Sequence, residues 1–242
     1  MDFMFNKLER LSTLSLVNLD LSNTNNMSYM FNGCSSLNEI KIANLKESSV
    51  KDYSYMFNNC LSLKYINLNN IQVSKERNTM EYMFNNCIAL QSLDLSAFKG
   101  SLVGNSMDNM FNSCINLTSI NLKNIDISQT SKVNKIFEGT KNLQYLILSN
   151  LKADNKNISY LFNNLTKLVS IDLSNFQGSS INTSMEYMFN NCKNLVKLDL
   201  SKLNSLTALD MNHMFNGCSS LKYLNLSTFR ETYSKSFSYM FN

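Results

Sequence analysis

Residues 80–98 read MEYMFNNCIALQSLDLSAF, and variants of this stretch recur from one end of the 242-residue chain to the other. A phenylalanine anchors each copy, and successive anchors are 25 to 27 residues apart. A fixed period of this length is the signature of a solenoid, in which each unit buries its apolar side chains against its neighbours. The anchors are Phe5, Phe31, Phe57, Phe84, Phe111, Phe137, Phe162, Phe189, Phe215 and Phe241.

Composition and charge narrow the class of protein. With 44% hydrophobic and 17% charged residues, the chain has enough apolar material for a continuous core and too little charge for disorder. The net charge of +4 is small, and the basic residues are scattered among carboxylates, so we expect no nucleic-acid binding. No apolar run approaches the roughly 20 residues of a membrane span, and no signal peptide is recognisable.

The unbroken repeat predicts one domain over residues 1–242, made of about nine units of 25–27 residues. The chain opens and closes inside a unit, so we expect it to be a piece of a longer array. Phe237, Met240 and Phe241 have no following strand to cover them. These exposed ends predict end-to-end self-association.

The first part of each unit has the pattern of a short helix. Met80, Met83 and Phe84 stand at i, i+3 and i+4, which places them on one helical face. Two residues past most anchors comes glycine or asparagine, the residues that tolerate the left-handed conformation closing a helix. These are Gly33, Asn59, Asn86, Gly139, Asn164, Asn191 and Gly217. The pattern predicts a helix of about two turns.

The second part of each unit alternates as a half-buried strand does. Leu90, Leu93 and Leu95 fit the L-x-x-L-x-L core of a leucine-rich repeat. The sequence therefore predicts an α/β leucine-rich-repeat solenoid, with short parallel strands stacked in one curved sheet and short helices on the other side.

The combined pattern M-x-x-M-F-N-x-C-x-x-L-x-x-L-x-L resembles the BspA-like leucine-rich-repeat surface proteins of bacteria and some protists. The match spans essentially the whole chain and is weakest at residues 136–140 and 161–165. Residues that carry it include Met27, Met30, Phe31, Asn32, Cys34, Leu37, Ile40 and Ile42. The resemblance implies an extracellular or cell-surface protein with an adhesion-type or host-contact role.

Six cysteines stand three positions past their anchors: Cys34, Cys60, Cys87, Cys114, Cys192 and Cys218. Pairing of adjacent units by disulfides is arithmetically allowed. Leu8, Thr140 and Leu165 hold the same place in other units, however, and these residues fill space without bridging. We therefore predict free, buried thiols. No short-spaced Cys or His pairs indicate zinc, and we predict no metal and no cofactor.

Aromatic residues recur two positions before the anchor, at Phe3, Tyr29, Tyr55, Tyr82, Tyr160, Tyr187 and Tyr239, interrupted by Asn109, Lys135 and His213. This column is predicted to cover the edge of the core; the alternative is an aromatic strip for a glycan or a partner. His213 is the sole histidine, and no nucleophile elbow, phosphate-binding loop or metal motif occurs. We predict that the chain is not an enzyme.

Side chains between the inward leucines form the exposed face of the stacked strands. They vary more than the core does, which is typical of a ligand-reading surface and equally of a solvated one. Exposed tyrosines favour an interface. The candidate ligand face comprises Tyr65, Tyr145, Tyr223, Lys41, Asp94, Asp172, Asp199 and Lys197.

Two hypotheses from different classes remain. The chain is either a scaffold that binds an unknown protein or glycan on another cell, or a passive stalk that presents another domain.

Overall fold

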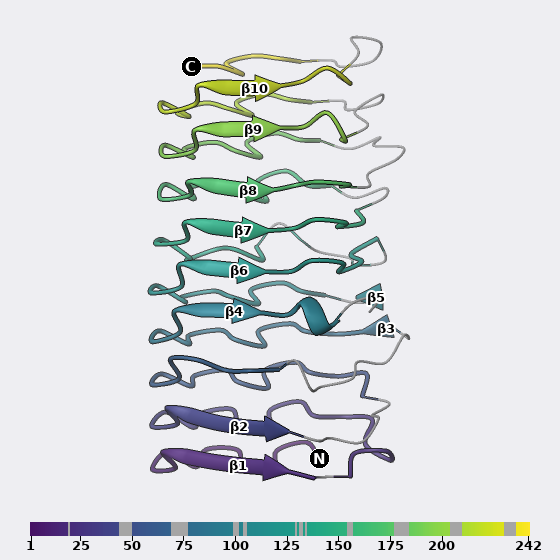
Figure 1. The fold of residues 1–242 in the computed structure, drawn as a ribbon, viewed down its shortest axis with the longest axis vertical. Coiled ribbons are helices and arrows are strands. Elements are labelled where there is room, and N and C mark those ends of the chain that lie inside the picture. Colours follow the sequence, from purple (N-terminus) through teal and green to yellow (C-terminus); the bar gives the residue numbers. More distant parts are fainter. Residues whose placement is uncertain are drawn as a thin grey trace.

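The structure is a computed structural model in which each repeat makes one coil of a parallel solenoid (Figure 1). We number the coils by their anchors, so that coil one contains Phe5, coil six Phe137, coil seven Phe162 and coil eight Phe189. The structure describes residues 1–18, 20–43, 50–68, 77–98, 102–103, 106–128, 130, 133, 135–153, 157–176, 184–203, 210–229 and 236–242.

The strands of one face rise in chain order along the long axis of the molecule, at most one to a coil (Figure 1). The strand pairs of this face are parallel and join equivalent repeat positions, as in the row formed by Leu93, Ile120, Leu146 and Ile171. This register confirms the predicted stacking of parallel strands. The strands of this face are β1 (Thr13–Val17), β2 (Glu39–Ala43), β4 (Ser92–Asp94), β6 (Ser119–Asn121), β7 (Tyr145–Ile147), β8 (Ser170–Asp172), β9 (Lys197–Asp199) and β10 (Tyr223–Asn225).

The prediction of a single continuous sheet is wrong. Among the described residues, this face is divided into three groups. One is the pair of β1 and β2, the second is the four-stranded group of β4, β6, β7 and β8, and the third is the pair of β9 and β10. Residues 63–68 of coil three form no strand, and β8 and β9 are not hydrogen-bonded to each other. A separate short pair, β3 (Arg77–Asn78) and β5 (Leu102–Val103), lies beyond the strand ends in Figure 1.

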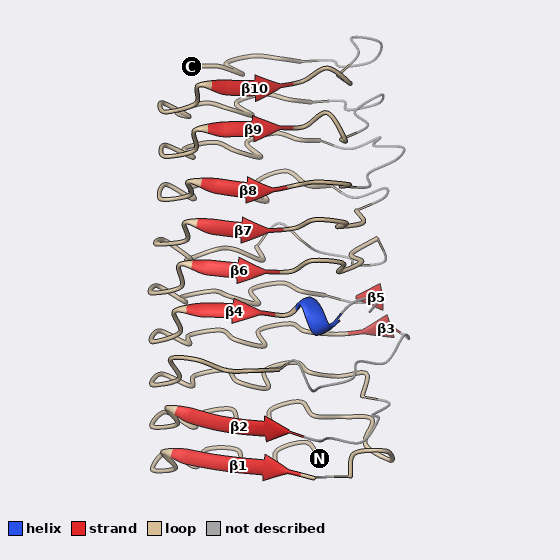
Figure 2. Cartoon of the chain, viewed as in Figure 1, coloured by secondary structure: helices blue, strands red, loops and turns tan. Residues whose placement is uncertain are grey.

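The predicted helices are also wrong. Loops and turns dominate Figure 2, and the described part of the chain holds one helical element, the single 3₁₀ turn η1 (Ser96–Phe98). The segment expected to be helical is a run of tight turns, because residues two before and two after the anchor have left-handed backbones. In coil three these are Tyr55 and Asn59, both with φ of 59°. An α-helix accommodates no such residue.

The turn segments, which run from four residues before each anchor to three after it, are hydrogen-bonded in two directions. Within coil three, the N–H groups of Met56, Asn58 and Cys60 donate to carbonyls three residues earlier. The N–H of Phe57, between them, donates to Met83 of the next coil at 2.8 Å. Alternate amides therefore close turns and join coils, and the turn segments form a second parallel ladder.

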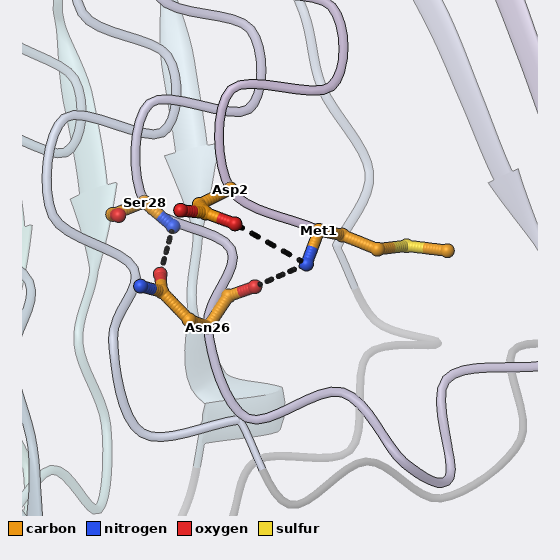
Figure 3. A network of polar contacts seen from close by, with 4 residues as sticks. All are labelled: Met1, Asp2, Asn26 and Ser28. Atoms are coloured by element: carbon orange, nitrogen blue, oxygen red, sulfur yellow. Dashed lines mark hydrogen bonds and ion pairs between the residues drawn. The ribbon is translucent and has the colours of Figure 1, made fainter.

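Asparagine, aspartate or serine opens most turn segments, five residues before the anchor. In Figure 3 the Asn26 Oδ1 accepts the N–H of Ser28 at 2.7 Å, and the Asn26 carbonyl accepts from the amino group of Met1 at 3.0 Å. The amino group also lies 3.9 Å from a carboxylate oxygen of Asp2. Such side-chain bonds mimic a backbone turn and fix where the segment begins. Asp52, Ser106, Asn157, Ser184 and Asp210 act in the same way.

The core is one continuous cluster between the strands and the turn segments. Anchor rings stack along it, for example Phe57 on Phe84 with centroids 5.4 Å apart. The leucines of the strands and the methionines of the turn segments fill the remaining space and, away from the two end coils, are almost fully buried. Because each coil covers the next, burial per coil repeats along the molecule.

Candidate functional site

The three tyrosines of the candidate ligand face lie on the exposed side of the strands. The exposed fractions of Tyr65, Tyr145 and Tyr223 are 58%, 50% and 47%. The Tyr65 hydroxyl donates to the side-chain carbonyl of Gln91, and the Lys197 ammonium lies 5.0 Å above the Tyr223 ring. These contacts hold the rings in place without covering them.

The three aspartates of this face also terminate their strands. Asp94 Oδ1 accepts the N–H of Ser96 at 2.8 Å, and Asp199 Oδ1 accepts the N–H of Ser201 at 2.8 Å. Asp172 makes the same bond with the serine two residues on. This turn explains why serine dominates the position after the strand, a D-x-S signal that is visible in the sequence.

Hydrogen bonding sets the ionisation of these carboxylates. Burial raises the pKa of Asp94, but hydrogen bonds from Ser96 and Asn121 outweigh it, so the pKa lies below its usual value. Hydrogen bonds from Ser201 lower the pKa of Asp199. Both groups are therefore charged at neutral pH, and a partner on this face meets fixed negative charge at the strand ends.

The eight candidate residues do not form one site. Asp172, Lys197 and Asp199 line a groove of about 320 Å³ where β8 and β9 separate, and Tyr223 lies opposite Lys197 on β10. The others are spread along the stack: Lys41 on β2, Tyr65 in coil three, Asp94 on β4 and Tyr145 on β7. Tyr65 borders a second hollow of about 660 Å³.

The asparagines directly after the anchors form a ladder of hydrogen-bonded side chains. This role was not predicted from the sequence. Asn58 Nδ2 donates to Asn32 Oδ1 at 2.6 Å, and Asn85 Nδ2 donates to Asn58 Oδ1 at 2.6 Å. The same bonds join Asn163, Asn190 and Asn216. The signal was the asparagine that follows nine of the ten anchors, with Glu138 the exception.

The cysteine column is a further hydrogen-bonded row. All six thiols are free, and each donates to the anchor carbonyl of the preceding coil, as Cys87 does to Phe57 at 3.0 Å. Burial raises the pKa of Cys87 well above its usual value. The described residues contain no group of three or more side chains suited to hold a metal ion.

The aromatic column is a stack of rings. Tyr29 and Tyr55 lie 4.6 Å apart, nearly parallel, and His213 lies between Tyr187 at 4.5 Å and Tyr239 at 5.1 Å. Stacking covers the ring faces and leaves the edges to solvent. The rings of the column are therefore packed against one another, and a ring face is open only where the stacking is interrupted.

Comparisons with known proteins identify relatives of the repeat. A family model described as "Mycoplasma protein of unknown function, DUF285" matches residues 1–98, 64–167 and 156–242. No curated protein matches. No described helix is long and apolar enough to cross a membrane.

Solved structures with some likeness include an internalin from Listeria monocytogenes, at 18% identity and a TM-score of 0.42, covering 91% of this chain and 62% of that one. The chain thus spans less than two thirds of the internalin. A leucine-rich cell surface protein from Faecalibacterium prausnitzii is 14% identical, with a TM-score of 0.39, and the match covers 93% of this chain and 83% of that one.

Proposed function

We propose that this chain, which belongs to the family described as Mycoplasma protein of unknown function, DUF285, and is matched by its model over its whole length, is a non-catalytic binding scaffold. Its strand face holds a protein partner in an adhesion-type contact at a cell surface. The cell-surface location and the membership of the BspA-like proteins are parts of this proposal, and both rest on the resemblance of the repeat to that family.

The observation that carries the proposal is the exposure of Tyr65, Tyr145 and Tyr223 on a single face. Tyrosine supplies a large contact area with few rotatable bonds, and it is enriched at protein interfaces. A lone exposed apolar residue needs no explanation, but three such rings along one side of the stack give spaced anchors for one partner.

Charge and shape around these rings suit a protein more than a featureless polymer. The groove between β8 and β9 is lined by the side chain of Lys197 and by the carboxylates of Asp172 and Asp199. A partner with a matching alternation of charge gains orientation there, since electrostatic complementarity fixes register more than it adds affinity.

The test is adsorption of the purified chain to surfaces coated with extracellular-matrix protein extract. We expect saturable binding by the unchanged chain and at least a tenfold weaker affinity when Tyr65, Tyr145 and Tyr223 are all replaced by serine. The matched control replaces Ile115 and Tyr239, which are also exposed but lie outside the strand face, and should bind normally. Melting temperatures verify that all variants are folded.

Three outcomes would contradict the proposal. Equal binding by the tyrosine and control variants would remove the strand face from the interaction. Binding that disappears when glycosidases strip the matrix would identify a glycan as the partner. No binding by the unchanged chain to matrix or to intact cells would favour the passive stalk.

A further inference from the structure

The anchor ring of coil seven is turned relative to the anchor rings of both neighbouring coils. This ring, Phe162, lies at 29° to the rings of Phe137 and Phe189, whereas the other adjacent anchors are 3° to 15° apart. On the strand side coil seven stays with coil six, since β7 pairs with β8. On the turn side it stays with coil eight, since Phe162 N–H donates to Met188. The turn segments of coils six and seven therefore part.

The parting leaves two facing rows of backbone groups. In the regular ladder the N–H groups at the anchor and two residues later donate to the next coil. Here the N–H groups of Phe137 and Gly139 have no partner among the described residues. The carbonyls that would receive them, on Leu161 and Asn163, likewise accept no bond from any described residue.

Three local features of coil six accompany the missing bonds to coil seven. Gly139 is so close to coil five that an added Cβ would lie 2.6 Å from the backbone nitrogen of Ser113. The described residues two positions before the anchors have left-handed backbones, with the exception of Lys135 in coil six. Coil six therefore does not follow the regular turn path. The Thr140 hydroxyl bonds to the carbonyl of Phe137 in its own coil, where a cysteine would bond to the preceding coil.

A cleft of about 620 Å³ lies between the turn segments of coils six and seven, and its volume is within the range of ligand sites. Tyr160 forms part of its wall and is 41% exposed. One face of the Tyr160 ring stacks on Tyr187 at 5.0 Å. The other face has no described ring against it, because Lys135 stands at the corresponding place in coil six.

We propose that this cleft binds an extended peptide segment of a protein partner, with an aromatic side chain of the peptide stacked on Tyr160. An extended main chain presents N–H and C=O groups alternately along each edge. Its carbonyls fit the N–H groups of Phe137 and Gly139, and its N–H groups fit the carbonyls of Leu161 and Asn163, none of which has a partner among the described residues. The peptide ring takes the place that a tyrosine fills elsewhere in the column.

The probe is the blocked tripeptide acetyl-Gly-Tyr-Gly-amide, titrated into the isotope-labelled 242-residue chain and followed by amide resonances. We expect saturable shifts at Phe137 and Gly139, and at least fivefold weaker binding of the blocked Gly-Leu-Gly tripeptide. Shifts confined to other parts of the chain, or equal binding of the leucine peptide, would overturn the proposal. Saturable shifts with methyl glucoside but not with the tyrosine peptide would assign the cleft to a sugar and overturn it as well.

A matched pair of substitutions locates the binding. Lys135→Tyr puts a ring against Tyr160 and should abolish the shifts. Asn109→Tyr fills the neighbouring vacancy in the same column, one coil away, and should leave them intact. Tyr160→Leu removes the stacking face and should weaken binding at least fivefold.

Unchanged binding by folded Lys135→Tyr and Tyr160→Leu proteins would refute the peptide site. The triple serine variant of the strand face should bind the tripeptide normally. This separates failure of the cleft from failure of the proposed matrix binding.

Discussion

Replacing Asn58 by alanine tests whether the asparagine ladder holds the coils together. The side chain is 8% exposed, and it donates to Asn32 and accepts from Asn85, both at 2.6 Å. Each bond contributes about 1 kcal/mol net, and the substitution also leaves one acceptor and one donor without partners. Because Asn32 and Asn85 are partly exposed, water satisfies them in part, so we expect a loss of about 2–4 kcal/mol.

Asn112 is the matched control, since it occupies the same place in coil five but is outside the ladder. Its Nδ2 reaches only Asn109, at 3.5 Å, and its Oδ1 accepts from the Ser113 hydroxyl. Asn112→Ala should therefore cost about 1 kcal/mol. Urea unfolding followed by circular dichroism measures both, and midpoints are compared because repeat arrays depart from two-state behaviour. Equal losses in the two variants would refute the ladder as a source of stability.

Three further predictions concern the buried thiols, the glycine between coils five and six, and the exposed ring of Phe241. The free energy of unfolding should fall as the pH rises from about 9 to 11, because burial raises the pKa of Cys218 to about 11 and of Cys114 to about 12, while unfolded thiols ionise near their usual value. Urea midpoints measured at each pH check this prediction. Cys114→Ala should make the fall of the midpoint with rising pH less steep. Gly139→Ala should lower the melting temperature more than Gly33→Ala, since both backbones are left-handed but only Gly139 meets a neighbouring backbone at 2.6 Å. Light scattering over a concentration series should show association of the 242-residue chain that weakens with Phe241→Lys, because 63% of that ring is exposed.

The spacing of residues was enough to set the register of every coil. The leucines at alternate positions had to face one interior, because a one-residue slip would turn them all to solvent. The paired rows of Leu93, Ile120, Leu146 and Ile171 follow directly from that constraint. Exposure of Tyr65 and Tyr145 was equally readable, since both stand between inward leucines.

The turn segments show where the pattern misled. Apolar residues at Met80, Met83 and Phe84 fit a helix, but a series of three-residue turns repeats them at nearly the same spacing. Tyrosine is a poor candidate for a left-handed backbone, so nothing in the sequence suggested φ of 54° at Tyr82. The stacking of Tyr82 on Tyr55 and the amide bonds to the next coil offset that cost.

The sequence by itself determined the solenoid, its register, its buried core and the side chains that face solvent, because apolar periodicity admits one inward face. Only the tertiary structure decided which coil each turn segment bonds to, and so where the stack opens. Coil seven bonds forward on its turn side and backward on its strand side. That choice depends on contacts between residues about 26 positions apart, such as Gly139 against Ser113, which no local pattern encodes.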